Sequence, residues 1–238
     1  MAALEAPLIE TRGLTLHFGG LKAVDGVDFS LRPGEIHALI GPNGAGKTTF
    51  VSLLSGRRMA QSGTIRLGGE DISRLPAHAR VKRGIAYTFQ ITSIFPRLTV
   101  FDNVALAVQA QGRRELATRT RAALARVGLQ GLEEQEAQTL SYGHQRLLEL
   151  AMGLALKPRL LILDEPTQGL AASEIEGFKA LVRSLVPETT VLLIEHNMEV
   201  VMDLATRITV LTFGRVLATG TPAEIRANPA VQEAYLGA

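Results

Sequence analysis

Hydrophobic positions divide the chain into short apolar runs towards its two ends and a region of helical spacing between them. Near the N-terminus, β-branched and apolar residues interrupted by glycine predict strands at 9–18, 27–33 and 35–40. Two later runs, at 159–165 and 189–196, are almost continuously apolar, which is typical of strands buried on both faces. A helical pattern follows each of these later runs, so the alternation indicates a mostly parallel sheet covered by helices.

Residues 99–155, between these two groups of strands, have a different character. Arg- and Ala-rich stretches with helical spacing, such as 113–129, replace the β-branched runs. We therefore expect a helical subdomain inserted into the α/β body. The chain has no repeat of about 20–50 residues and no low-complexity tract, which indicates one compact unit.

Composition narrows the classes of function. The 238 residues are 46% apolar and 20% charged, which is typical of a folded globular protein and too apolar for disorder. A net charge of +2 offers no strongly basic surface, so nucleic acid is not an expected partner. Because cysteine is absent, disulfides, thiol nucleophiles and thiolate zinc sites are excluded.

The sequence does not predict a segment that enters a membrane. Glu5 and Glu10 stand where a secretory signal carries basic and then apolar residues, so export is not expected. Apolar runs such as 160–163 and 191–194 are far shorter than the ~20 residues of a spanning helix. If the protein works at a membrane, a partner must hold it there.

The strongest motif is Gly-Pro-Asn-Gly-Ala-Gly-Lys-Thr at 41–48, which matches GxxxxGK[ST] between a predicted strand and a helix that opens at Gly46. Such a loop directs backbone N–H groups and a helix N-terminus at phosphate oxygens. Lys47 is expected to neutralise the β- and γ-phosphates of ATP, and Thr48 to bind Mg²⁺. The alternative is a glycine-rich turn without a ligand. The predicted nucleotide-binding residues of this segment are Gly41, Pro42, Asn43, Gly44, Ala45, Gly46, Lys47, Thr48 and Thr49.

Two adjacent acids, Asp164 and Glu165, end the predicted buried strand at 159–165. The carboxyl ends of strands are where open α/β sheets bind ligands. Asp164 is expected to bind Mg²⁺, and Glu165 to orient or deprotonate the attacking water. The structural alternative is a pair of acids that caps a strand beside a solvated loop.

A further segment, Leu-Ser-Tyr-Gly-His-Gln at 140–145, opens a helical run about twenty residues before Asp164. The order of the phosphate loop, Gln90, this signature segment, the acid pair and His196 resembles the ABC ATPase family over nearly the whole chain. The resemblance implies a P-loop NTPase (RecA-like) α/β core with an antiparallel β subdomain and an inserted helical subdomain. It also implies one ABC ATPase domain over 1–238, with the core at 1–90 and 156–238 and the helical signature subdomain at 91–155.

The family resemblance assigns the signature segment to an ATP bound on the opposite subunit. Ser141, Gly143 and His144 would contact that nucleotide, so the active unit would be a head-to-tail homodimer or a heterodimer with a related ATPase. A serine and a glycine at a helix start are also a common N-cap arrangement. His144 stands where the family usually has glutamine, and Ala171, in the loop after the acid pair, lacks a side chain for the cross-interface hydrogen bond.

The same resemblance assigns three isolated residues. Gln90 would contact Mg²⁺ or the attacking water and report to a membrane partner, and His196 would contact the γ-phosphate. Phe18 would stack on adenine. Each has a structural alternative: a solvated residue at a strand edge for Gln90, a strand-end residue for His196, and a core side chain for Phe18.

A single ABC domain without a membrane span resembles the separate ATPase subunit of a transporter, bound to permease subunits at the cytoplasmic face of the inner membrane. Segments 18–29, 88–104 and 195–237 are similar to those of importers for branched-chain (hydrophobic) amino acids. The alternatives are urea or lipopolysaccharide transporters and a soluble ABC ATPase without a transport role. The segment 88–104, with Ile94, Phe95 and Leu98, is the expected docking surface for the permease unless these side chains fill the subdomain core.

Overall fold

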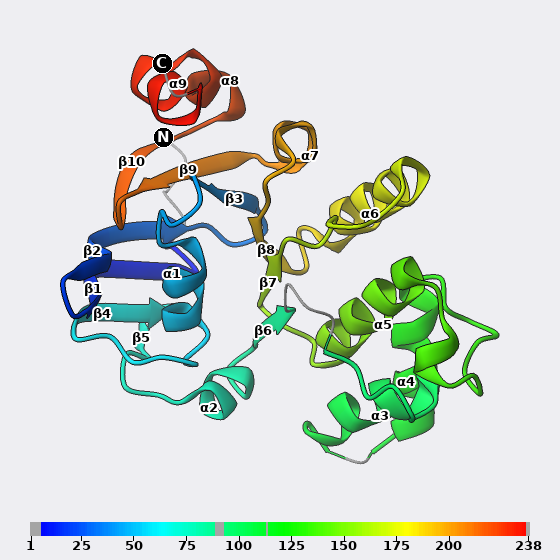
Figure 1. Cartoon of the computed structure of the whole chain (residues 1–238). Coiled ribbons are helices and arrows are strands. Elements are labelled where there is room, and N and C mark those ends of the chain that lie inside the picture. Colours follow the sequence, from blue (N-terminus) through cyan, green and yellow to red (C-terminus); the bar gives the residue numbers. More distant parts are fainter. Residues whose placement is uncertain (1–5, 89–92, 113, 237–238) are drawn as a thin grey trace.

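The computed structural model describes residues 6–88, 93–112 and 114–236 (Figure 1). In chain order, its helices and strands are β1 (Ile9–Phe18), β2 (Leu21–Leu31), β3 (Ile36–Ile40), α1 (Lys47–Leu54), β4 (Ser62–Leu67), β5 (Glu70–Asp71), α2 (Ala77–Val81), β6 (Ile85–Thr88), α3 (Val100–Gln109), α4 (Leu116–Arg126), the 3-10 helix η1 (Ala137–Thr139), α5 (Tyr142–Ala155), β7 (Leu160–Asp164), α6 (Ala172–Leu185), β8 (Thr190–Ile194), α7 (Met198–Leu204), β9 (Arg207–Thr212), β10 (Arg215–Gly220), α8 (Pro222–Ala227) and α9 (Pro229–Leu236).

The described strands form two sheets. One is antiparallel, with the order β2-β1-β4-β5, and lies beside α1 in Figure 1. The other has the order β10-β9-β3-β8-β7-β6, in which all neighbours are parallel except the β9–β10 pair. Every residue of β3, β7 and β8 is buried, because other elements cover both faces of these central strands. The predicted mostly parallel sheet is therefore confirmed.

Helices α3, α4 and α5 gather on one side of the molecule, apart from the antiparallel sheet (Figure 1). They account for the helical spacing of residues 99–155, and helix α4 falls within the predicted run 113–129. The boundaries of a helical subdomain at residues 91 and 155 stay a prediction.

Strand β2 is longer than the hydrophobic pattern indicates, because it starts at Leu21 instead of residue 27. Gly26 has a φ of 67° and interrupts the alternation of side chains, and its N–H donates to the hydroxyl of Thr15 at 3.0 Å. The β1–β2 register shifts at several points along this stretch. A β-bulge therefore absorbs the glycine that breaks the pattern in the sequence.

Alternate residues of β7 belong to different hydrophobic clusters. Leu160 and Ile162 pack with α1 and the antiparallel sheet, whereas Leu161 and Leu163 pack with α5 and α6. This follows from the two-residue period of a strand, which sends successive side chains to opposite faces. The acid pair after β7 is therefore held between two packed layers.

Arg80 of α2 anchors the end of α1. Its fully buried guanidinium donates to the carbonyls of Leu53 and Leu54 at the C-terminus of α1, and to those of Ser73 and Leu75. Burial lowers the pKa of Arg80 to about 10, so the side chain stays charged at neutral pH. A cation is favourable at a helix C-terminus, and this one fixes the helix whose other end begins at the phosphate loop.

Candidate active site

The turn between β3 and α1 admits only glycine at two positions. Gly46 has a φ of 101°, and a Cβ there would lie 2.0 Å from the carbonyl oxygen of Ala23. At Gly41 a Cβ would lie 2.2 Å from the carbonyl oxygen of Leu211. The backbone is packed this closely because the turn has neighbours from β2 and β9, and this packing holds the loop ahead of the N-terminus of α1.

Lys47 is buried at the start of α1 and folds back onto the loop. Its Nζ donates to the carbonyl of Gly41 at 2.6 Å and to that of Pro42 at 3.1 Å. Burial lowers the pKa of Lys47, and the negative charges of Glu165 and Asp164 oppose this shift. The ammonium group is thus aimed at the loop, where it can exchange carbonyl oxygens for phosphate oxygens.

A cavity of about 250 Å³ opens over this turn, and most of the predicted site residues meet in it. Its lining consists of Phe18, Leu21, Ala23, Asn43, Gly44, Ala45, Gly46, Lys47, Thr48, Thr49, Glu165 and His196. A second cavity of about 560 Å³ shares Phe18, Thr48 and Thr49 with the first and is completed by Ser52, Arg57 and Arg58. The two cavities together lie along α1, from Glu165 to Phe18, and Asp164 lines neither of them.

Phe18 is 41% exposed, and the guanidinium carbon of Arg58 lies 5.0 Å from the centroid of its ring. Phe18 is therefore not a core side chain, which removes the structural alternative for this residue. A cation over an aromatic face is attractive. Stacking of adenine on the ring stays a prediction.

Glu165 and His196 approach each other from the ends of β7 and β8. The Nε2 atom of His196 lies 2.9 Å from Oε1 of Glu165. Glu165 has a φ of 49°, which is uncommon outside glycine, and its N–H donates to the carbonyl of Ile194 at 2.8 Å. A strained backbone at a residue that lines the cavity supports a functional role for its carboxylate.

Glu195 holds the loops that carry these two side chains and was not singled out in the sequence. One carboxylate oxygen of this buried residue accepts the N–H of Thr167 at 3.0 Å and also its hydroxyl. The other oxygen accepts the N–H groups of His196 at 2.8 Å and Asn197 at 3.1 Å. An acid at the end of an apolar strand, directly before His196, was the signal that could have identified it.

Asp164 is only 3% exposed, and the Tyr87 hydroxyl donates to its Oδ2 at 2.5 Å. Burial raises the pKa of Asp164, and the hydrogen bond from Tyr87 opposes the shift. Thr48, in the first turn of α1, lines both cavities and carries a hydroxyl. A carboxylate and a hydroxyl are hard oxygen donors of the kind that Mg²⁺ prefers.

Asp164→Asn is expected to raise the thermal stability of the chain at about pH 7.5, measured without nucleotide and with a chelator of divalent cations. Because the folded pKa of Asp164 is raised, its ionised form favours the unfolded state at every pH above that pKa. For a chain of this size, each kcal/mol of added stability raises the melting temperature by about 2–4 °C. The gain is expected to shrink as the pH falls through the folded pKa.

Differential scanning fluorimetry over a series of pH values measures this effect. Asp203→Asn serves as the matched control, because Lys179 lowers the pKa of that carboxyl and the same change is expected to destabilise the protein at neutral pH. A lower melting temperature for Asp164→Asn at neutral pH would contradict the prediction.

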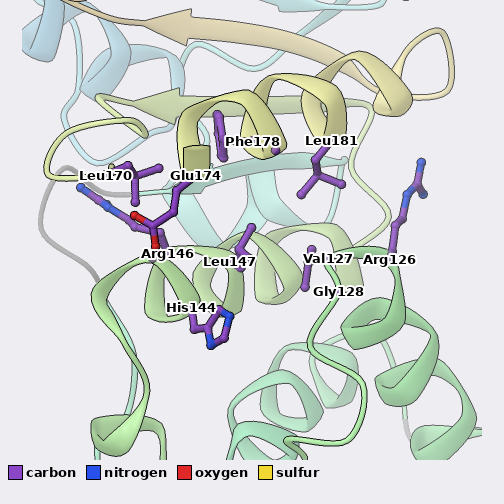
Figure 2. Close-up of a pocket in the computed structure, with 12 residues that line it drawn as sticks. Arg126, Val127, Gly128, His144, Arg146, Leu147, Leu170, Glu174, Phe178 and Leu181 are labelled. Carbon is purple, nitrogen blue, oxygen red and sulfur yellow. The ribbon is translucent and has the colours of Figure 1, made fainter. Parts of the chain in front are cut away.

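The signature residues do not reach the phosphate-loop cavity of their own chain. Gly143 and His144 line a separate cavity of about 300 Å³ between α5 and α6 (Figure 2), and Ser141 is the N-cap of α5, where its hydroxyl accepts the N–H of His144 at 3.3 Å. The N-cap arrangement weighed for Ser141 is therefore present. Contact of these residues with an ATP on another subunit stays a prediction.

Glu174 of α6 links the signature segment to the loop that follows the acid pair. Its Oε2 accepts the N–H of Ala171 at 2.8 Å, and a Cβ at Gly143 would lie 2.2 Å from its Oε1. Figure 2 shows this side chain reaching from α6 towards the start of α5. The backbone of Ala171 thus makes a hydrogen bond within its own chain. Its methyl side chain can neither donate nor accept a hydrogen bond with a partner subunit.

Gln90, predicted to act at the Mg²⁺ or the attacking water, lies outside the described residues. Its role stays a prediction.

A glycine-rich turn between β3 and α1 with the GxxxxGK[ST] pattern, an Asp-Glu pair at the end of β7 and a histidine after β8 define a P-loop nucleotide-hydrolysing protein. The family model described as ABC transporter matches residues 24–168, and one described as branched-chain amino acid ATP-binding cassette transporter matches residues 215–238. The chain belongs to the ABC transporter family as an ATP-binding subunit that hydrolyses ATP. Among the described residues, no helix has the length and apolar character needed to span a membrane.

Relatives resemble the chain over nearly its full length. The high-affinity branched-chain amino acid transport ATP-binding protein BraF of Pseudomonas aeruginosa is 41% identical, and the alignment covers 98% of this chain and 99% of BraF. The corresponding LivG of Escherichia coli K12 is 39% identical with the same coverage. A probable branched-chain amino acid transport ATP-binding protein LivG of Archaeoglobus fulgidus is 35% identical over 97% of this chain and 96% of its own length.

Solved structures confirm the expected fold. The ADP conformation of MJ1267, an ATP-binding cassette of an ABC transporter, aligns with a TM-score of 0.87 and 26% identity over 98% of this chain and 100% of that one. A nucleotide-free ATP-binding cassette from an ABC transporter aligns with a TM-score of 0.89 and 25% identity over the same shares. The P-loop core with an antiparallel β subdomain and an inserted helical region is therefore that of the ABC ATPases.

Proposed function

We propose that this chain powers an importer of branched-chain or other hydrophobic amino acids. The observation that carries this proposal is the 39–41% identity, over 98% of the chain, to ATP-binding proteins named for branched-chain amino acid transport. Residues 215–238 also match the family model described as branched-chain amino acid ATP-binding cassette transporter. The ATPase does not touch the cargo, so this substrate class rests on relatedness.

The residues at the cavity fit ATP bound with Mg²⁺. Thr48 and Asp164 would hold the cation, which when bound would neutralise negative charge on the phosphates. Among the described residues there is no cluster of three or more His, Cys, Asp or Glu side chains suited to a metal. Mg²⁺ keeps several waters and uses one or two protein ligands together with the phosphates.

We infer that the side chains of the cavity have separate roles in ATP hydrolysis. Lys47 leaves the carbonyls of the loop and pairs with the phosphates. Glu165 accepts a proton from the attacking water. The Nε2 atom of His196 lies 2.9 Å from the Glu165 carboxylate and orients it, and His196 lines the same cavity, where it would contact the γ-phosphate. Glu195 keeps both of their loops in place.

A second copy of this chain, or a related ATPase, completes the site. The support is the position of Gly143 and His144, which line a cavity between α5 and α6 and not the one over the phosphate loop. In a head-to-tail dimer, Ser141, Gly143 and His144 of each subunit would face the ATP of the other.

The loop before α3 is the proposed docking surface for the membrane permease. Phe95 is 51% exposed, and its backbone is held on both sides by the buried amide of Asn103, with Phe95 N–H to Oδ1 at 2.7 Å and Nδ2 to the Phe95 carbonyl at 3.0 Å. Ile94 and Leu98 are partly buried, and Ile94 packs against the hydrophobic core that includes α3 and α5. The loop thus presents one exposed aromatic side chain whose backbone is hydrogen-bonded to Asn103, and such a side chain suits a binding surface.

Phe95→Glu is expected to abolish co-purification with the permease subunits, because a buried carboxylate without a partner is costly at an interface. The ATPase of the isolated chain is expected to stay unchanged. The measurement is affinity purification from detergent-solubilised membranes, with turnover assayed in parallel. Leu106→Glu is the matched control, since Leu106 of α3 is also exposed, at 41%. Loss of folding in Phe95→Glu, detected by its melting curve, would show that Phe95 serves the core instead.

The substrate class is tested by transport. Cells that lack the gene are expected to lose most uptake of labelled leucine, isoleucine and valine, and to regain it with the wild-type chain but not with Lys47→Ala. Uptake of labelled urea serves as the comparison. Normal branched-chain uptake in the deletion strain, with loss of urea uptake, would contradict the proposed substrate class while leaving the ATPase role intact.

A further inference from the structure

Asp164 needs hydrogen-bond donors because it is buried beside a second acid, Glu165. Tyr87 supplies one, since its hydroxyl donates to Asp164 Oδ2 at 2.5 Å, a length typical of a charge-assisted O–H···O⁻ bond. Tyr87 is not part of the phosphate loop, the acid pair or the signature segment. Its contact with Asp164 joins strand β6 to the proposed cation site.

The sheet explains why Tyr87 reaches this carboxylate. In the β6–β7 ladder Tyr87 lies opposite Ile162, two residues before Asp164, so Tyr87 and Asp164 point to the same face of the sheet. Two residues of strand span roughly 6.6 Å. A tyrosine ring with its hydroxyl crosses that span and ends in a donor, whereas a phenylalanine ring ends in a C–H group.

Arg57, in the segment between α1 and β4, lies against the ring of Tyr87. Its guanidinium carbon is 5.2 Å from the centroid of the Tyr87 ring, within the range of a cation–π interaction. Burial raises the pKa of Asp164, and the positive charges of Arg57 and Lys47 are among the influences that oppose the shift. Arg57 also lines the larger cavity together with Thr48, the other proposed Mg²⁺ ligand.

We propose that Tyr87, held by Arg57, is a positioning residue for Asp164, engaging one carboxylate oxygen so that the other is directed to the cation of Mg·ATP. The inference rests on the proposed Mg·ATP site and adds two residues to it. Hydrogen-bond partners outside the coordination shell fix the orientation of a ligating carboxylate, and their loss weakens metal binding. If Tyr87 served only to pack the core, removal of its hydroxyl would leave metal affinity unchanged.

The test is the affinity of the full-length chain for Mn²⁺ in the presence of a non-hydrolysable ATP analogue, followed by electron paramagnetic resonance. Tyr87→Phe keeps the ring for Arg57 and removes only the donor, and it is expected to weaken Mn²⁺ binding about tenfold. Binding of the analogue in the presence of a chelator is expected to stay the same, because Lys47 and the loop are intact. Thr88→Val is the matched control: it removes a hydroxyl from the next residue of β6, which bonds to the Ile162 carbonyl.

A double-mutant cycle tests whether Arg57 affects Mn²⁺ affinity through Tyr87. Arg57→Gln is expected to weaken Mn²⁺ binding several-fold in the wild-type background and much less in Tyr87→Phe, because it acts through the hydroxyl. An Mn²⁺ affinity of Tyr87→Phe within about twofold of the wild type would overturn the inference. Equal effects of Arg57→Gln in both backgrounds would overturn the role of Arg57. Absence of analogue-dependent Mn²⁺ binding in the wild type would instead contradict the proposed function.

Discussion

Replacing Glu165 with Gln is expected to lower the turnover of ATP by about 1000-fold while leaving ATP binding in place. The amide keeps the shape of the side chain and its contact with His196, but it cannot take a proton from the attacking water. Because bound ATP then persists, the variant is expected to elute as a dimer from a sizing column in the presence of Mg·ATP. Steady-state phosphate release and analytical gel filtration measure the two effects.

Lys47→Ala is the comparison for this experiment, because it removes the cation that faces the phosphates and is expected to weaken ATP binding itself. The two variants therefore separate loss of chemistry from loss of binding. Turnover of Glu165→Gln at the wild-type rate would remove Glu165 from the role of base. If Glu165→Gln hydrolyses ATP slowly but stays monomeric with ATP, the assignment of Glu165 as the base is supported and the proposed ATP-induced dimer is contradicted.

Glu195→Gln is expected to lower ATP turnover by about 100-fold and to destabilise the fold by about 3 kcal/mol. One oxygen of Glu195 accepts two hydrogen bonds from Thr167, and the other accepts the N–H groups of His196 and Asn197. Whichever way the glutamine turns, its NH₂ group faces at least one backbone N–H, which is a donor and cannot accept a hydrogen bond. The loops that carry Glu165 and His196 would then separate.

Chemical denaturation and steady-state kinetics measure the two effects of this change. Glu199→Gln is the matched control, because Glu199 is an exposed acid four residues further on, at the start of α7. A role limited to folding would lower stability with unchanged turnover in the remaining folded protein. That result, or wild-type stability together with wild-type turnover, would contradict the positioning role.

Much of the fold follows from local patterns. Strand β1 has the predicted bounds, and α1 begins directly after Gly46, because glycine placement and apolar periodicity are properties of short segments. The true start of β2 was missed for the opposite reason. Gly26 looks like a break in the chain, and only pairing with β1 turns it into a bulge within a longer strand.

The alternatives for single residues could not be decided in the same way. A phenylalanine at the end of a predicted strand packs in a core or faces a ligand equally well, and only the neighbouring elements show that Phe18 lies open beside Arg58. Ser141 is an N-cap in this structure, and a further role for it depends on a second subunit. Local sequence does not encode which surface a residue shares with distant segments.

The sequence by itself determined the phosphate loop and the acid pair, because each works through residues that adjoin in the chain and through the strand or helix beside them. Only the tertiary structure decided what holds these groups in place. Tyr87 and Asp164 are 77 residues apart, and Glu195 and Thr167 are 28 apart. Such pairs meet because parallel strands bring their carboxyl ends to one edge of the sheet, and no local pattern records which side chains will face each other there.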